Sequence, residues 1–334
     1  MTELLATTPG VYPLPDDAKT DLAHLKGHQK DDLVSGAEGS DVRNIYDRAR
    51  ETVLTDQRET GLDRVVEGQL RWDDMLAHPL CVHDAVDTRG IVRYYDNNNF
   101  YREPVVENEL DFDGDLAGDL KVAAEIASTD SLQAVVPGPY SLADLAEDDF
   151  YGDETAFLEG IADFLVGEIE AFPDVETLFV LEPSLVVNPP EDGADERASE
   201  AISRVASATD AEVVVQTYWG ALTEKVHAHL LDAEIDAVGY DFVSDHEANL
   251  YNISEYGTKG SIALGIVDGQ NTLVEDPAKI DERIEWVREK SPMQAFDRIY
   301  VTPNTELFYL PVTKYREKLA ALAEAVSPAE VSAT

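Results

Sequence analysis

Short runs of apolar and β-branched residues recur along the chain, and each run ends in a polar residue, a glycine or a proline. Longer stretches with apolar residues at three- and four-residue spacing separate these runs. The short runs have the composition of buried strands, and the longer stretches have the periodicity of amphipathic helices. The predicted strands cover residues 5–12, 91–95, 132–137, 177–181, 212–218, 237–242, 262–267 and 298–302.

Three segments carry clear helix signals. Phe157, Ile161 and Phe164 belong to an apolar stripe that predicts a helix over residues 155–172. An Asp-Pro pair at residues 276–277 has the form of a cap followed by a first-turn proline, and a helical stripe follows it. Ser141 and Asp144 have the spacing of a capping box, which predicts that a helix begins there.

A strand followed by a helix, repeated about eight times, predicts an α/β protein that folds as a single (β/α)8 TIM-type barrel. Each parallel strand needs a crossover, and the crossover helices cover the outside of the barrel. The barrel is expected to span residues 1–326, with a flexible tail at residues 327–334. An open doubly wound sheet is the alternative. It is disfavoured because residues 9–13, Pro-Gly-Val-Tyr-Pro, cannot open a helix as a phosphate-binding turn does.

The charge of the chain excludes two classes of partner. Lys and Arg total 25 against 68 Asp and Glu, a formal net charge of −43. A protein that binds nucleic acid or an anionic membrane needs a clustered basic surface, and this composition supplies none. We therefore expect no nucleic-acid partner and no membrane partner. The acidic excess is typical of a halophilic protein in a salt-rich cytoplasm, where short Debye lengths screen self-repulsion, so a cytoplasmic location is expected.

The residues that usually hold metals are sparse. Cys81 is the single cysteine, so a thiolate cluster within this chain is excluded. His227 and His229 stand two residues apart, which places them on different sides of a helix, whereas a metal-binding pair needs a spacing of four. The sequence therefore predicts no metal site.

Polar and aromatic residues close the predicted strands. In a parallel barrel the chemistry gathers where strands end, so these residues form the candidate site. Glu182 and Asp241 are the candidate catalytic carboxylates, because a carboxylate that closes an apolar run is costly to bury without a partner. A purely structural role for Glu182, bonded to backbone amides at the barrel rim, is equally open. The candidate substrate-binding residues are Tyr12, Asp96, Asn98, Tyr218, Trp219, Asp268, Asn271 and Asn304.

Several ordered motifs resemble the cobalamin-independent methionine synthase family. They are residues 8–13 (TPGVYP), 61–63 (GLD), 67–69 (EGQ), 74–75 (DM), 97–104, 137–142 (PGPYSL), 181–183 (LEP), 216–219 (QTYW) and 264–271 (LGIVDGQN). The resemblance implies a TIM-type barrel that works in methyl transfer from a methylated folate or a related donor to homocysteine. It also implies that the catalytic barrel of the family holds zinc through one His, two Cys and one Glu.

The positions that hold the zinc ligands in that family carry other residues in this chain. By the motifs, they fall at Val215, Thr217, Asp241 and Thr305. Residues 97–104 and 263–271 instead resemble the zinc-less N-terminal barrel of the two-barrel enzymes, as in a single-barrel, archaeal-type relative. This resemblance implies that this chain binds no cofactor and that zinc is held by a partner, a separate zinc-bearing methionine synthase chain.

Two other functions remain open from the sequence. One is a non-catalytic regulatory barrel that binds folate or an amino acid. The other is a self-sufficient methyltransferase with an altered site around Glu182, Asp241 and Asp268.

Overall fold

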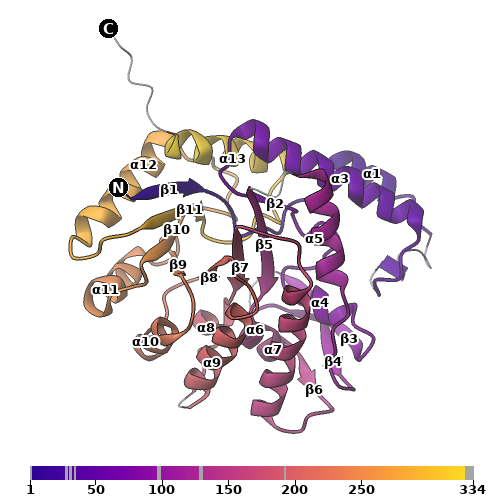
Figure 1. Ribbon diagram of the computed structural model, residues 1–334. Helices are drawn as coiled ribbons and strands as arrows, with labels where there is room; N and C mark the ends of the chain where they lie inside the picture. The colour runs from indigo at the N-terminus through magenta and orange to yellow at the C-terminus, as the bar shows by residue number, and fades with distance from the viewer. Residues whose placement is uncertain are drawn as a thin grey trace.

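Eight parallel strands curl into a barrel with helices on its outside (Figure 1). The computed structural model describes residues 2–26, 29, 32–33, 35–95, 99–127, 131–191 and 193–327. The barrel strands are β1 (Glu3–Ala6), β2 (Val65–Val66), β5 (Leu132–Pro137), β7 (Thr177–Leu181), β8 (Glu212–Gln216), β9 (Ala237–Asp241), β10 (Ser261–Val267) and β11 (Arg298–Pro303). Their hydrogen-bonded order is β1-β11-β10-β9-β8-β7-β5-β2.

The two outer strands of this order, β1 and β2, are joined by contacts around their ends. The backbone N–H of Asp63 donates to the carbonyl of Ala6 (3.0 Å), and the N–H of Tyr12 donates to the carbonyl of Gly68 (2.8 Å). The Asp63 carboxylate also accepts the N–H of Ala6 at 2.7 Å. These bonds close the ring, and the predicted TIM-type barrel is confirmed.

One predicted barrel strand is wrong. Residues 91–95 overlap β3 (Val86–Arg93), which pairs antiparallel with β4 (Phe100–Val106); β4 pairs with β6 (Glu147–Asp148) in a separate three-stranded sheet. Ile91 is 64% exposed, so this strand is not a buried barrel strand. The second barrel strand is the two-residue β2, which is too short to form a distinct apolar run. We call β3 and β4 the hairpin.

Among the helices of the described residues, some begin at a residue whose side chain caps the helix and others have no such cap. They are α1 (Asp16–Leu22), α3 (Ser40–Thr60), α4 (His78–Cys81), α5 (Asp115–Ile126), α6 (Pro139–Leu145), α7 (Glu154–Glu170), α8 (Ser184–Val187), α9 (Ala194–Ala206), α10 (Glu224–Asp232), α11 (His246–Tyr256), α12 (Pro277–Lys290) and α13 (Val312–Val326). The predicted helices at α7 and α12 are confirmed, and the Asp276 side chain caps α12 by accepting the N–H of Ala278. The predicted capping box at Ser141 is wrong, because α6 begins at Pro139 and has no side-chain cap.

Two further observations concern the C-terminal tail and helices that could span a membrane. The expected flexible tail, residues 327–334, lies outside the described residues except for Ser327. Within the described residues, no helix has the length and apolar content needed to cross a membrane.

Buried Arg50 links α3 and α5 to the segment after β2 through ion pairs. Arg50 of α3 is fully buried, and its guanidinium pairs with Glu67 after β2 at 3.0 Å. It also pairs with Asp119 of α5 at 2.8 Å and with Asp47 of its own helix at 2.9 Å. Because Glu67 is buried as well, neither partner of the Arg50–Glu67 pair can turn to water if the other is removed.

We expect Arg50→Met to lower the free energy of unfolding by about 3–5 kcal/mol, because it leaves the buried Glu67 carboxylate without its counter-charge. Chemical denaturation measures this change. Arg48→Met is the matched control: Arg48 lies on the same helix and pairs with Asp21 on the surface, an interaction worth about 0–1 kcal/mol. Equal losses in the two variants would contradict the role assigned to Arg50.

Candidate functional site

The carboxyl ends of the barrel strands meet at one end of the barrel, and most of the predicted site residues lie there. We call this region the barrel mouth and define it as Glu182 after β7, residues 217–219 after β8, Asp241 at the end of β9 and residues 304–306 after β11. Loops that follow parallel strands converge at this end of a barrel, which explains why residues far apart in sequence meet.

Asp241 has five hydrogen bonds to its carboxylate. One oxygen accepts the backbone N–H groups of Val243 (2.9 Å) and Ser244 (2.8 Å) and the side-chain amide of Asn304 (3.0 Å). The other accepts the N–H of Trp219 (2.8 Å) and the hydroxyl of Ser244 (2.6 Å). Burial raises the pKa of Asp241, and these bonds oppose that effect. Because both oxygens are occupied, Asp241 shapes three loops and has little capacity left for a ligand.

Asn304 ties the loops after β9, β10 and β11 together. Its amide nitrogen donates to Asp241, and its amide oxygen accepts the backbone N–H of Gly269 at 2.9 Å. Trp219 adopts a left-handed backbone conformation, with φ at 70°, and this conformation accompanies the hydrogen bond from its N–H to Asp241. A non-glycine residue with positive φ is sparsely populated and needs support from its surroundings, which Asp241 supplies.

Glu182 is buried and holds the start of α6. Its carboxylate accepts the backbone N–H groups of Tyr140 (3.0 Å) and Ser141 (2.8 Å) and the Ser141 hydroxyl (2.6 Å). Burial raises the pKa of Glu182 to about 7, against the effect of these hydrogen bonds. A Cβ atom at Gly138 would lie 2.0 Å from the Glu182 carboxyl carbon, so glycine is required for this approach. The geometry therefore favours the structural role for Glu182.

Three buried polar groups at the mouth have no hydrogen-bond partner among the described residues: both carboxylate oxygens of Glu306, the Tyr218 hydroxyl and the side-chain oxygen of Gln216. Burial, and to a smaller extent the nearby Asp241 charge, raises the pKa of Glu306 to about 7. Buried polar groups are usually paired, so these are the groups of the mouth that retain bonding capacity. The sequence analysis missed Glu306, although it follows the final strand within three residues.

Tyr95, which follows β3, lies against the mouth. The Tyr95 hydroxyl lies 2.7 Å from the Ser184 hydroxyl, and the Tyr95 ring lies 5.2 Å from the Trp219 ring. The Trp219 ring in turn packs edge-on against Tyr218 at 4.9 Å. Glu182, Tyr218 and Asp241 are all fully buried.

The structure brings together only some of the predicted site residues. Glu182, Tyr218, Trp219, Asp241 and Asn304 lie at the mouth, while Asp96 and Asn98 lie outside the described residues. Their roles in binding or catalysis remain predictions.

The other predicted substrate-binding residues are engaged elsewhere. Tyr12 is buried, and its hydroxyl donates to Gln57 of α3 at 2.9 Å. Asp268 accepts the backbone N–H of Asn271 at 3.1 Å within an exposed turn. Both arrangements stabilise the local fold.

The mouth does not offer the donor set of a catalytic zinc site. Val215, Thr217 and Thr305 occupy positions where the resemblance places zinc ligands, and none of their side chains is a normal zinc ligand. Asp241 occupies the fourth, and its oxygens are already bonded. Within the described parts of the chain, no cluster of three or more His, Cys, Asp and Glu side chains is arranged to hold a metal.

We expect Glu306→Gln to change how stability depends on pH. The raised pKa means that folded Glu306 keeps a proton that the unfolded chain releases, so the wild-type free energy of unfolding falls as pH rises from about 4.5 to about 7. A shift of this size corresponds to about 3 kcal/mol. Relative to wild type, the variant should gain about that amount between pH ~5 and pH ~8 in chemical denaturation.

Glu59→Gln, on the exposed face of α3, is the control for Glu306→Gln and should show no such gain. A parallel pH dependence in wild type and Glu306→Gln would show that Glu306 is not a buried, unpaired carboxyl.

Comparisons with known proteins agree with this architecture. The family model for the cobalamin-independent synthase, N-terminal domain, matches residues 82–292, more than half of the chain. A methionine synthase of Saccharolobus solfataricus is 22% identical over 326 residues, which cover 96% of this chain and 93% of that protein. The 5-methyltetrahydropteroyltriglutamate–homocysteine methyltransferase of Bacillus subtilis is 24% identical over 245 residues, which cover 71% of this chain and only 31% of that longer protein.

A solved structure extends the likeness to the fold. The B12-independent methionine synthase from Shewanella sp. W3-18-1 superposes with a TM-score of 0.77 at 18% identity, and the match covers 96% of each chain. Because the family model matches more than half of the chain, this chain belongs to the cobalamin-independent methionine synthase family.

Proposed function

We propose that this chain acts in methionine biosynthesis as a zinc-less subunit, together with a separate zinc-bearing methionine synthase chain. In this proposal the complex transfers a methyl group from a methylated folate, or a related donor, to homocysteine in the cytoplasm. The observation that carries the proposal is the donor chemistry of the barrel mouth, where Val215, Thr217 and Thr305 stand at positions that would have to ligate zinc.

The reaction needs a nucleophile that this mouth does not activate. A thiol becomes a strong nucleophile as a thiolate, and a bound zinc ion supplies that activation by lowering the thiol pKa. Of the buried carboxylates here, Glu182 and Asp241 are already bonded to backbone N–H groups, and Glu306 on its own lacks the further ligands that a zinc ion needs. Activation of homocysteine is therefore assigned to the partner chain.

Two of the comparisons support a reaction divided between polypeptides, whereas the Saccharolobus solfataricus methionine synthase, matched over 93% of its length, is a chain of about this size. The family model that matches this chain describes an N-terminal domain. The alignment with the Bacillus subtilis methyltransferase covers only 31% of that protein. A single barrel that corresponds to one part of a longer enzyme needs the remaining part from another chain, if the activity is the same.

The proposal predicts that the isolated chain purifies with substoichiometric zinc. The reason is that a catalytic zinc site needs about three protein ligands, and the mouth offers no such set. Elemental analysis of freshly purified protein, with a zinc-bearing homologue as the reference, makes the measurement. One zinc held per chain and released by substitution of Asp241 would contradict the proposal.

The proposal also predicts a complex with functional consequences. Mixed at high salt, where the net charge of −43 is screened, this chain and the zinc-bearing chain should co-elute in size-exclusion chromatography. Methyl transfer to homocysteine by the mixture should exceed that of the zinc-bearing chain alone. Absence of both effects would refute the subunit role, and turnover by the isolated chain would favour a self-sufficient enzyme.

A further inference from the structure

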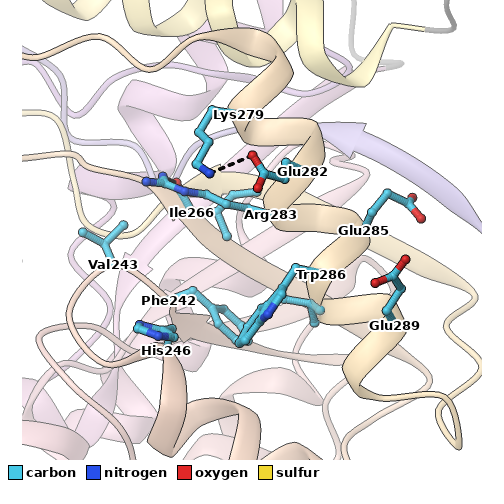
Figure 2. A pocket seen from close by; sticks show the side chains of 11 residues that line it. Phe242, Val243, His246, Ile266, Lys279, Glu282, Arg283, Glu285, Trp286 and Glu289 are labelled. Atoms are coloured by element: carbon cyan, nitrogen blue, oxygen red, sulfur yellow. Dashed lines mark hydrogen bonds and ion pairs between the residues drawn. The ribbon is translucent and has the colours of Figure 1, made fainter.

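A cavity of about 630 Å³ lies outside the barrel, between the segment that follows β9 and the helix α12 (Figure 2). Its lining residues come from that segment, from α12 and from Ile266 near the end of β10. Pockets that bind small molecules have volumes of about 300–1,000 Å³. The cavity is therefore large enough for a ligand, and it is separate from the groups that fill the barrel mouth.

One wall of the cavity is aromatic. The Trp286 ring packs edge-on against Phe242, with centroids 6.5 Å apart, and against His246, with centroids 5.7 Å apart. Figure 2 shows the three rings gathered at the same end of the cavity. Trp286 is only partly buried, so part of its ring surface faces the cavity rather than the protein core. A flat ring can stack on such a surface.

A cation that lacks a carboxylate partner faces the same cavity. The Arg283 guanidinium donates through Nη1 to the backbone carbonyl of Ile266, which fixes its position. It forms no ion pair with any described carboxylate, whereas Arg50, Arg71 and Arg298 each pair with at least two. A guanidinium has five N–H donors in a planar fork that suits a carboxylate, and most of those of Arg283 have no partner.

The acidic residues around the cavity do not neutralise Arg283. Glu282 pairs with Lys279 at 2.7 Å. Glu285, which pairs with Arg288, and Glu289 also line the cavity, but both side chains point away from the Arg283 guanidinium (Figure 2). In a chain of net charge −43, a partly buried arginine that keeps free donors beside an aromatic wall points to an anionic ligand.

The cavity also contacts the loop that holds Asp241. Val243 lines the cavity, and the backbone N–H groups of Val243 and Ser244 both donate to the Asp241 carboxylate. A ligand in the cavity would therefore bind directly behind a loop of the barrel mouth.

We propose that this cavity binds a planar aromatic molecule that carries a carboxylate, with its ring against Trp286 and its carboxylate on Arg283. The site is independent of the proposed partner chain, so binding can be tested on the full isolated chain. Failure of this inference would leave the subunit role intact, and failure of complex formation would leave this site intact.

Isothermal titration with four probes tests the site. Folic acid and p-aminobenzoylglutamate each combine a ring with carboxylates, glutamate has the carboxylates without a ring, and AMP has a ring with a phosphate. We expect saturable binding of the first two, at least tenfold weaker binding of glutamate because it cannot use the aromatic wall, and weaker binding of AMP. Failure of both aromatic carboxylates to bind, or tighter binding of AMP, would overturn the assignment.

Substitutions on α12 test whether the ligand binds in this cavity. Arg283→Met and Trp286→Leu should each weaken p-aminobenzoylglutamate binding about tenfold or more, through loss of the charge-assisted contact and of the stacking surface respectively. Arg288→Met is the matched control, because Arg288 lies on the same helix, pairs with Glu285 and does not line the cavity. Circular dichroism checks folding. If Arg283→Met is unstable, Trp286→Leu alone tests the site. If the variant that is tested binds p-aminobenzoylglutamate as tightly as Arg288→Met does, the proposed site is refuted.

Discussion

Burial of carboxylates at the carboxyl ends of the barrel strands shapes the loops of this protein. A buried carboxylate is tolerated only when hydrogen bonds replace its water, and Asp241 obtains five from three different loops. Glu182 obtains three from the start of α6, and Gly138 leaves room for it. The conformations of Trp219 and of the Val243–Ser244 turn therefore depend on the same requirement.

Much of the barrel could be predicted from the sequence, because a buried parallel strand is a continuous apolar run bounded by polar residues. The runs at residues 132–137 and 177–181 coincide with β5 and β7. The run at 5–12 is longer than β1, since the backbone turns at Gly10 and Val11, both with positive φ. β2 could not be predicted, because two residues are too few to show a periodic pattern. It is a barrel strand because it pairs with β5, which is a tertiary contact.

The candidate site was only partly predictable, because a residue's position at a strand end does not reveal its partners. Asp241 and Asn304 both close strands and do contact each other. Asp268 also closes a strand, yet its carboxylate is used by its own exposed turn. Glu306 was missed because its distinguishing feature is a buried carboxylate with no partner among the described residues, and no local sequence pattern shows such burial.

Tyr95, which follows β3, connects the segment after that strand to the barrel mouth. Its ring lies 5.2 Å from the Trp219 ring and its hydroxyl lies 2.7 Å from the Ser184 hydroxyl, while Glu306 and Tyr218 are buried. Because the Trp219 N–H also bonds to Asp241, a substitution of Tyr95 acts on the same residue whose left-handed backbone Asp241 supports.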